Sequence, residues 1–389
     1  MIPLSIPNIN GNELKYIKEC LDTNWVSSAG KFVKLFEEKI AEYCGVNYAI
    51  ACVNGTSALQ VSLRIAGIKP GDEVLVPTIT FIAPVNAIHY NDAKPIFMDV
   101  DQYYNIDSKK TIEFIKKETF FENGFSYNKK TKNKISAIIP VHMWGNAVWL
   151  DDLVDICEER NILIIEDASE SLGSFYTEGK YCKKHTGSIG LLGCLSFNGN
   201  KIITTGGGGM IITNDSELAN KAQYLITQAK DDPIRYIHNE IGYNFRITNI
   251  QAALGLAQLE QLPKFLKNKR KLYEKYVDLI QKINGLSIVP PPDYSQNNHW
   301  INILSINSKD YGFCMEEIMS KLNIDGIQTR PVWFPNHLQK PYLDCEKYKI
   351  RFAEKLVENS LCLPSGSGLN KDDIELVISF LKNYKKNIA

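Results

Sequence analysis

The chain has 389 residues, which is long enough to bury a large core and to form two domains. Its 44 basic and 44 acidic residues balance, so we expect no long-range field that would attract nucleic acid or an anionic membrane. Residues 1–8 lack the basic and apolar regions of a signal peptide, and no apolar stretch approaches the roughly 20 residues of a membrane span.

The cysteines and histidines add to this picture. Nine scattered cysteines without a C-x-x-C pair indicate reduced thiols, and six dispersed histidines show no metal-ligand spacing. These features predict a cytoplasmic protein without a metal site.

The first two thirds of the chain alternate short β-rich runs with amphipathic stretches, which is the order of an α/β sheet. The strand–helix–strand order implies parallel crossovers, which place the carboxyl ends of the strands on one rim. Phe81, His142 and Asp167 each follow such a strand and are therefore expected on this rim. The predicted strands cover 48–53, 73–76, 96–100, 135–141 and 162–165, and the predicted helices cover 33–44, 58–66 and 150–159.

The last third has a different pattern. A strongly helical segment covers 250–276, a proline run at 290–292 breaks the chain, and segments at 300–306, 322–328 and 371–385 suggest a small α+β unit. We therefore predict a large α/β domain over 1–254 and a small C-terminal α+β domain over 255–389. The lysine-rich stretch 119–134 predicts a solvated loop or hairpin rather than a binding patch.

Lys201 lies between a polar turn that begins at Ser196 and a run of glycines at 206–209. Upstream, an apolar strand ends at Asp167, and Thr56 and Ser57 lie at the start of a predicted helix, where free amides favour a phosphate. These are the groups that pyridoxal phosphate (PLP) needs: a lysine for the Schiff base, an acid for the pyridinium nitrogen and turns for the phosphate. Ser196 and Asn198 can donate to phosphate, and Phe81 is suitably placed to lie on the pyridine face.

Each of these residues also has an ordinary explanation. A lone lysine in a turn is more often a surface residue, Asp167 could be a helix cap, and Phe81 could be a core aromatic. The combination favours the PLP site.

Blocks of the sequence across nearly the whole chain resemble the DegT/DnrJ/EryC1/StrS sugar aminotransferases, which are fold-type-I PLP enzymes. The resemblance implies a mixed, mostly parallel seven-stranded sheet flanked by helices. The blocks are 24–30 with 36–37, 54–59, 71–77, 140–145, 166–168, 196–209, 242–246, 251–259 and 329–331.

Site residues can be carried over from this resemblance. Lys201 matches the Schiff-base lysine, Asp167 the pyridinium partner and Phe81 the stacking ring. Asn244 matches an asparagine that reaches the phosphate from the neighbouring subunit, which implies a homodimer with shared active sites. Phosphate or cofactor positions are matched by Thr56, Ser57, Ser196 and Asn198, and blocks that border the substrate contain Ser27, Ser28, His142, Arg246, Arg330 and His337.

Two departures from the family pattern narrow the subgroup. Gly207 stands where much of the family has Glu, and Glu170 stands where Gln is common, near the PLP hydroxyl. Segments 196–209 and 227–233 together resemble the branch associated with legionaminic-acid-type sugars. That branch aminates C4 of a UDP- or GDP-linked 4-keto-6-deoxy-N-acetylhexosamine, and we expect L-glutamate as the amino donor and a bacterial surface glycan as the destination.

Other functions stay open at this point. They are C3 amination of a dTDP-linked keto sugar, an α-amino-acid aminotransferase or lyase with Arg330 as carboxylate clamp, a PLP sugar dehydratase and a non-catalytic PLP-fold regulator. The dehydratases replace the Schiff-base lysine by histidine, which disfavours them here. Regulators carry a helix-turn-helix domain ahead of the PLP domain, and cofactor motifs that start near residue 54 leave no room for one.

Overall fold

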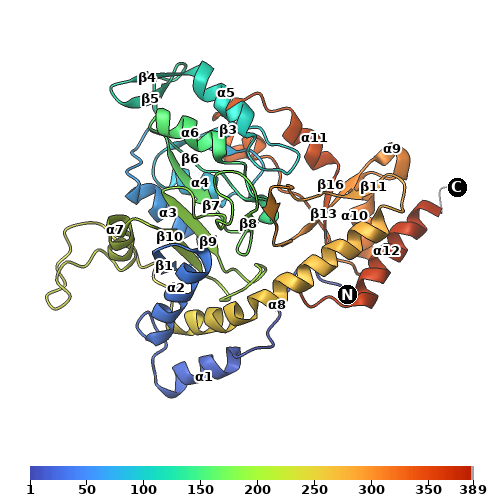
Figure 1. Ribbon diagram of the computed structural model, residues 1–389, viewed down its shortest axis with the longest axis horizontal. Coiled ribbons are helices and arrows are strands. Elements are labelled where there is room, and N and C mark those ends of the chain that lie inside the picture. Colours follow the sequence, from blue (N-terminus) through green and yellow to red (C-terminus); the bar gives the residue numbers. More distant parts are fainter. Residues whose placement is uncertain (387–389) are drawn as a thin grey trace.

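A ten-stranded sheet forms the centre of the molecule and is covered by helices on both faces (Figure 1). The computed structural model describes residues 1–386. The strands follow the order β1-β10-β9-β7-β6-β2-β3-β15, and the hairpin β4–β5 pairs with β6. Their bounds are β1 Tyr48–Cys52, β2 Glu73–Pro77, β3 Lys94–Met98, β4 Thr119–Glu122, β5 Phe125–Asn128, β6 Lys134–Ile138, β7 Leu163–Asp167, β9 Leu192–Ser196, β10 Gly209–Thr213 and β15 Glu346–Tyr348.

The sheet confirms the predicted fold class and corrects the predicted strand number. Pairing is parallel from β15 through β3, β2, β6 and β7 to β9, and antiparallel at β10 and β1. Ten strands are present rather than seven, because β15 adds to β3 from the C-terminal region and β4–β5 extends the sheet at β6. Segment 119–134 is thus a hairpin, as one of its two predicted forms required. All residues of β2 are buried, as expected for a strand with both faces covered.

The helices around this sheet begin and end where local signals place them. Asn54 caps α3 by accepting a hydrogen bond from the Ser57 amide at 2.7 Å, and Gly45, with φ +68°, ends α2 in the left-handed conformation. The helices that precede residue 249 in the chain are α1 Glu13–Asp22, α2 Lys31–Cys44, α3 Gly55–Ile65, α4 Ala83–His89, α5 Ser108–Glu118, α6 Asp151–Glu159 and α7 Ser216–Ile226, and a short 3-10 turn, η1, covers Met143–Gly145.

A single helix, α8 (Asn249–Ile280), connects the large sheet to the C-terminal part. Thr248 and Gln251 form a capping box at its start. The predicted domain division at residue 255 falls within this helix, so the division remains a prediction. In addition, β15 pairs with the large sheet, and β12 (Ser295–Gln296) pairs with β8 (Phe175–Tyr176).

The C-terminal part has its own apolar core around a four-stranded antiparallel sheet of order β11-β13-β16-β14. The predicted segment 300–306 supplies β13, and the predicted final helix is α12. The elements are β11 Leu286–Ile288, β13 Asn302–Ile306, α9 Ser308–Tyr311, α10 Met315–Ile324, β14 Arg330–Pro331, η2 Asn336–Leu338, η3 Lys340–Tyr342, α11 Phe352–Glu358, β16 Ser360–Leu363 and α12 Lys371–Lys386.

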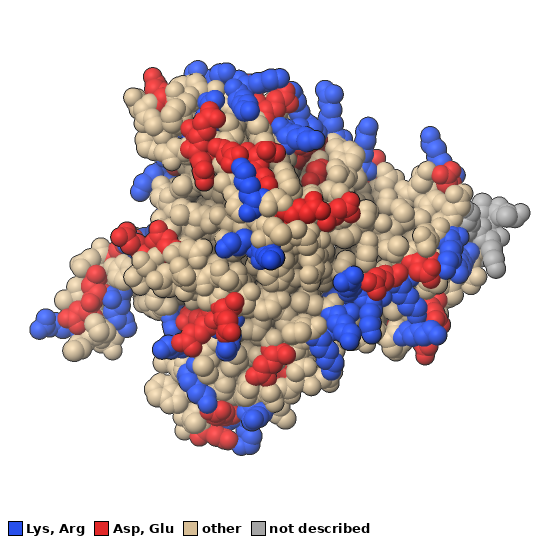
Figure 2. Space-filling view, viewed as in Figure 1, with Lys and Arg blue, Asp and Glu red and all other residues tan. Residues whose placement is uncertain are grey.

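The molecular surface carries both charge signs. On the face shown in Figure 2, basic and acidic side chains lie in scattered groups of both signs between broader uncharged areas. Within residues 1–386, none of the helices combines the length and the apolarity required to cross a membrane.

Asp99 ties the C-terminal part to the large sheet. Its carboxylate is fully buried after β3, accepts the amides of Arg351 and Phe352 at 3.0 Å and of Ala353 at 2.9 Å, and pairs with Lys110 Nζ at 2.5 Å. Burial alone would raise the pKa of this carboxyl, but Lys110 and the three amides outweigh it and lower the pKa.

We predict that Asp99→Asn lowers the free energy of unfolding by about 2–3 kcal/mol at neutral pH, because charge-assisted hydrogen bonds are lost. A carboxyl whose folded-state pKa is lowered stabilises the protein above the ordinary aspartate pKa of 3.8. The difference between the two proteins should therefore be constant above that pH and shrink as the pH falls through the folded-state value. Urea denaturation across this range measures it.

The exposed pair Lys18–Asp22 provides the control. Asp22→Asn should change stability by less than about 1 kcal/mol. An Asp99→Asn protein as stable as the wild type at neutral pH would contradict the assignment.

Candidate active site

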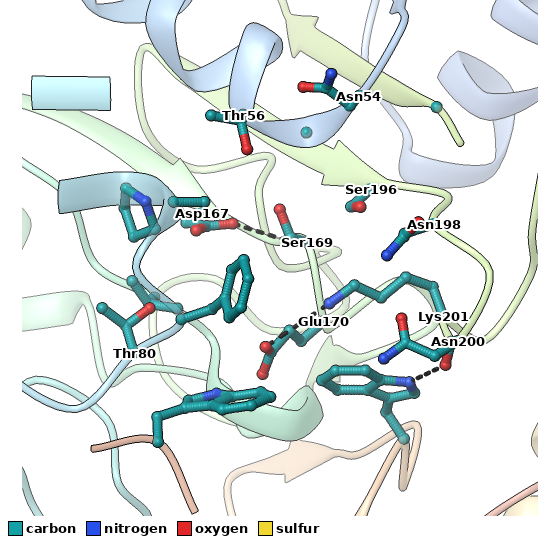
Figure 3. A pocket seen from close by; sticks show the side chains of 18 residues that line it. Asn54, Thr56, Thr80, Asp167, Ser169, Glu170, Ser196, Asn198, Asn200 and Lys201 are labelled. Atoms are coloured by element: carbon teal, nitrogen blue, oxygen red, sulfur yellow. Dashed lines mark hydrogen bonds and ion pairs between the residues drawn. The ribbon is translucent and has the colours of Figure 1, made fainter. Parts of the chain in front are cut away.

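A cavity of about 310 Å³ opens where β7 and β9 end and α3 begins (Figure 3). Residues 54–208 supply most of its wall, and Trp300 and Trp333 of the C-terminal part supply the rest. The lining residues are Asn54, Gly55, Thr56, Thr80, Phe81, Ala83, Pro84, Val141, Asp167, Ser169, Glu170, Ser196, Asn198, Asn200, Lys201, Gly208, Trp300 and Trp333.

The first turn of α3 forms one end of the cavity. The Asn54 side chain accepts the hydrogen bond of the Ser57 amide. Within residues 1–386, the amides of Gly55 and Thr56 have no side-chain acceptor, so these two first-turn donors remain available to a ligand. A Cβ on Gly55 would lie 3.0 Å from the Ser196 Cβ and 3.2 Å from the Ser169 Oγ, so this turn tolerates little added bulk. The arrangement is a small polar cradle for an anion at a helix N-terminus.

Asp167 lies at the end of β7, below this turn, and is 4% exposed. The Ser169 amide donates to its Oδ1 at 3.0 Å. Burial raises the pKa of the Asp167 carboxyl, while the hydrogen bonds from Ser169 and the charge of Lys201 act in the opposite direction. A carboxylate in this position can pair with a cationic ring nitrogen.

Lys201 enters the cavity from the opposite side, and its amine points toward Glu170 (Figure 3). The Nζ atom lies 3.7 Å from Glu170 Oε1 and 3.8 Å from the centre of the Trp300 ring. Burial lowers the pKa of the Lys201 amine, and the charges of Glu170 and Asp167 oppose this shift. A buried amine with a lowered pKa is a usable nucleophile.

Two aromatic rings, Phe81 and Trp333, meet in the wall of the cavity. Phe81 is 54% exposed and meets Trp333 edge to face, with ring centres 5.6 Å apart. Its location after β2 confirms the predicted place on the rim, and its exposed ring face is available to a planar ligand.

The two candidate histidines do not line the cavity. His142 is fully buried: its Nδ1 accepts the Val148 amide at 3.1 Å, so its Nε2 donates to Glu166 Oε2 at 2.8 Å. His337 is also buried, between Thr78 Oγ1 at 2.6 Å and Glu354 Oε1 at 3.2 Å. Both act as internal braces in this chain.

Several other candidates lie outside the lining. Ser27 and Ser28 are exposed, and their carbonyls accept from the Asn249 amide at 2.6 Å and from Arg246 Nε at 3.2 Å. Asn244 and Arg330 are exposed, and Ser57 is buried behind Asn54. The structure therefore brings together Lys201, Asp167, Glu170, Thr56, Ser196, Asn198 and Phe81.

Sequence reasoning missed Trp300, Trp333, Thr80, Ser169 and Asn200 as cavity residues. Trp300 supports the Lys201 amine, and its indole donates to the Asn200 carbonyl at 2.7 Å. Ser169 could have been suspected from its place two residues after Asp167, but the tryptophans come from a distant segment without a local signal.

A search of protein families matches residues 7–382 to the DegT/DnrJ/EryC1/StrS aminotransferase family. The chain belongs to this family. Enzymes of this family depend on PLP, so PLP is the cofactor of this chain.

Relatives and solved structures cover nearly the whole chain. A GDP-perosamine synthase from Caulobacter vibrioides is 37% identical over 98% of this chain and 97% of the relative. A UDP-4-amino-4-deoxy-L-arabinose–oxoglutarate aminotransferase from Shewanella sediminis is 28% identical over 99% and 98%. The crystal structure of DesI with its TDP-sugar product aligns with a TM-score of 0.87 and 26% identity, covering 99% of this chain and 93% of DesI.

The cavity residues fit PLP by their chemistry. The cradle at Gly55, Thr56 and Ser196 suits a phosphate, the buried Asp167 carboxylate suits a pyridinium nitrogen, and the Lys201 amine suits an aldehyde. The three groups line one cavity from different sides (Figure 3).

We predict that Asp167→Asn weakens PLP retention about 10- to 100-fold, because one charge-assisted hydrogen bond of about 1.5–3 kcal/mol is lost. Fluorescence titration of the PLP-free protein measures the dissociation constant. Asp215→Asn is the matched control, since Asp215 caps α7 and asparagine caps equally well. Equal PLP affinity in the wild type and Asp167→Asn would contradict the role given to Asp167.

Proposed function

We propose that the chain moves an amino group from L-glutamate to C4 of a nucleotide-linked 4-keto-6-deoxy-N-acetylhexosamine, for a bacterial surface sugar of the legionaminic-acid type. The observation that carries the proposal is the buried Lys201 amine, held in one cavity with Asp167 and the α3 cradle. The motif at 196–209, and its departure Gly207, support the subgroup.

The printed names of the relatives support parts of this substrate. One relative is named for amino transfer between UDP-4-amino-4-deoxy-L-arabinose and oxoglutarate, which supports both the C4 position and glutamate as donor. GDP and TDP also occur among the nucleotides in these names, so the carrier is an outcome of the test.

The residues of the chain have separable roles in this transfer. Bound PLP would carry the amino group and supply an electron sink when the carbon that bears this group loses its proton. Thr56 and Ser196 hold a phosphate, Asp167 keeps the ring nitrogen protonated, and Phe81 covers one face of the ring. Lys201 is the amine that attaches the cofactor and, once free, the base that moves the proton.

The proposal also includes a homodimer with shared sites. The arm, residues 228–244, projects from the body beyond α7 (Figure 1) and exposes Ile234, Tyr236 and Ile241 by 71–87%. Asn244, at its base, is exposed and outside the cavity of its own chain. Apolar side chains on a projecting segment favour a partner surface, and a second copy is the partner that gives Asn244 a site.

The first test supplies L-glutamate and then UDP-, GDP- or dTDP-4-keto-6-deoxy-N-acetylglucosamine to the PLP-loaded protein. We expect 2-oxoglutarate to form with glutamate alone, up to one equivalent per site, and to form catalytically with one keto sugar. Mass spectrometry identifies the carrier, and NMR of the product places the nitrogen at C4 or C3.

Lys201→Ala should lower turnover by a factor of about 100 to 10,000 or more. The substitution removes both the amine that attaches the cofactor and the base that moves the proton. Glutamate consumption without amination of any keto sugar would discard the proposed acceptor. Absence of 2-oxoglutarate with every amino donor would discard the aminotransferase reaction.

Shared sites predict complementation between two inactive variants, Lys201→Ala and Asn244→Ala. Refolded together, they should recover about a quarter of the wild-type activity, because half of randomly paired dimers are mixed and each mixed dimer has one intact site. A mixture no more active than its components would contradict the shared site.

A further inference from the structure

Glu170 is the second carboxylate of the cavity, and hydrogen bonds hold both its side chain and its main chain in place. Its side chain is about as buried as that of Asp167, and its Oε2 accepts the Trp144 amide at 2.9 Å. The Asn298 side chain donates to the Glu170 carbonyl at 2.9 Å and to the Leu172 carbonyl at 3.0 Å. Main chain and side chain are thus both positioned.

The turn that presents the Trp144 amide is itself strained. Trp144 has φ +50°, a conformation that non-glycine residues rarely adopt, and Gly145 follows with φ +89°. A Cβ on Gly145 would lie 2.1 Å from Asn298 Oδ1, so the turn and the Asn298 loop are packed around Glu170. In this strained turn, the Trp144 amide binds Glu170 Oε2, and Glu170 Oε1 is directed at Lys201.

The balance of charges in the cavity depends on Glu170 Oε1, the oxygen that faces Lys201. Lys201 faces two carboxylates, Asp167 and Glu170, and within residues 1–386 Glu170 also lies near the buried thiol of Cys362. When Lys201 carries its charge, one carboxylate is neutralised; when the amine is neutral, two buried carboxylates remain. Two such charges without a cation are costly. Bound PLP would supply a cation for Asp167 through its ring nitrogen, which leaves Glu170 as the carboxylate without one when the amine is neutral.

We propose that Glu170 takes the proton that Lys201 gives up when its amine becomes free to react, and returns it when the amine is released. The step converts Lys–NH₃⁺ and Glu–COO⁻ into Lys–NH₂ and Glu–COOH, and no other atom or electron leaves the pair. This deepens the proposed function and rests on its role for Lys201.

Two observations favour Glu170 over Asp167 for this role. Glu170 Oε1 is 3.7 Å from Lys201 Nζ, close enough for a rotation of the Lys201 side chain to join them. Asp167 accepts the Ser169 amide at 3.0 Å, and in the proposed function it pairs with the ring nitrogen, where it must stay charged. Burial also raises the pKa of the Glu170 carboxyl, and the charge of Lys201 opposes this.

The first experiment measures the pKa of the Lys201 amine in the full-length chain freed of PLP, by competitive labelling with acetic anhydride and mass spectrometry. In Glu170→Gln we expect this pKa to fall by about one unit or more, because an opposite charge within about 6 Å is removed. Glutamine keeps an oxygen for the Trp144 amide, so the turn is preserved.

Glu73→Gln is the matched control. Glu73 is a buried carboxylate at the amino end of β2, away from the cavity, and accepts from Asn128 Nδ2 at 2.9 Å. It should leave the Lys201 pKa unchanged. An unchanged pKa in Glu170→Gln as well would overturn the proposal.

The second experiment distinguishes proton uptake from simple charge pairing. Lys201→Met removes the cation, so Glu170 should be protonated at neutral pH. Its infrared spectrum should gain a protonated-carboxyl band relative to the wild type, in which Asp101, with a pKa of about 7, already contributes such a band. The added band should vanish in Lys201→Met/Glu170→Gln. No added band in Lys201→Met would overturn the proposal even if Glu170→Gln failed to fold.

Neither measurement uses a sugar or an amino donor. Failure of the proposed acceptor would therefore leave both results interpretable, and failure of the Glu170 role would leave the aminotransferase assay unaffected.

Discussion

A buried amine beside buried carboxylates is the constraint around which this molecule is organised. An ammonium group in a cavity needs a negative partner, and a neutral amine in the same place needs that partner to be discharged. Lys201, Asp167 and Glu170 meet this requirement on one rim because parallel strands deliver their carboxyl ends to the same edge. The aromatic wall at Trp300 then supports the charged form of the amine.

Most of the rim could be predicted because its signals are local. Asp167 ends an apolar run, Lys201 precedes a glycine run, and Asn54 begins a helix, so each position follows from its immediate neighbours. The family match then confirmed the fold and the cofactor. The three-residue strand β15 had no such signal, because its sequence Glu-Lys-Tyr is short and polar, and only its pairing with β3 makes it a strand.

The remaining candidates depend on contacts between distant segments. His142 is expected near the substrate from its place after a strand, yet Glu166 and the Val148 amide use both of its nitrogens inside the core. His337 is used in the same way by Thr78 and Glu354. No local pattern distinguishes a braced histidine from a free one, since the difference lies in which partners the fold brings to the ring.

The continuous helix α8 limits how the molecule can move. At 1.5 Å per residue its 32 residues span about 48 Å, with one end on the large sheet and the other on the C-terminal sheet. Strand pairs β3–β15 and β8–β12 fasten the two parts at further points. A hinge between them would have to bend the helix and separate these strands, so Trp300 and Trp333, the cavity residues of the C-terminal part, are tied to the large sheet at several points.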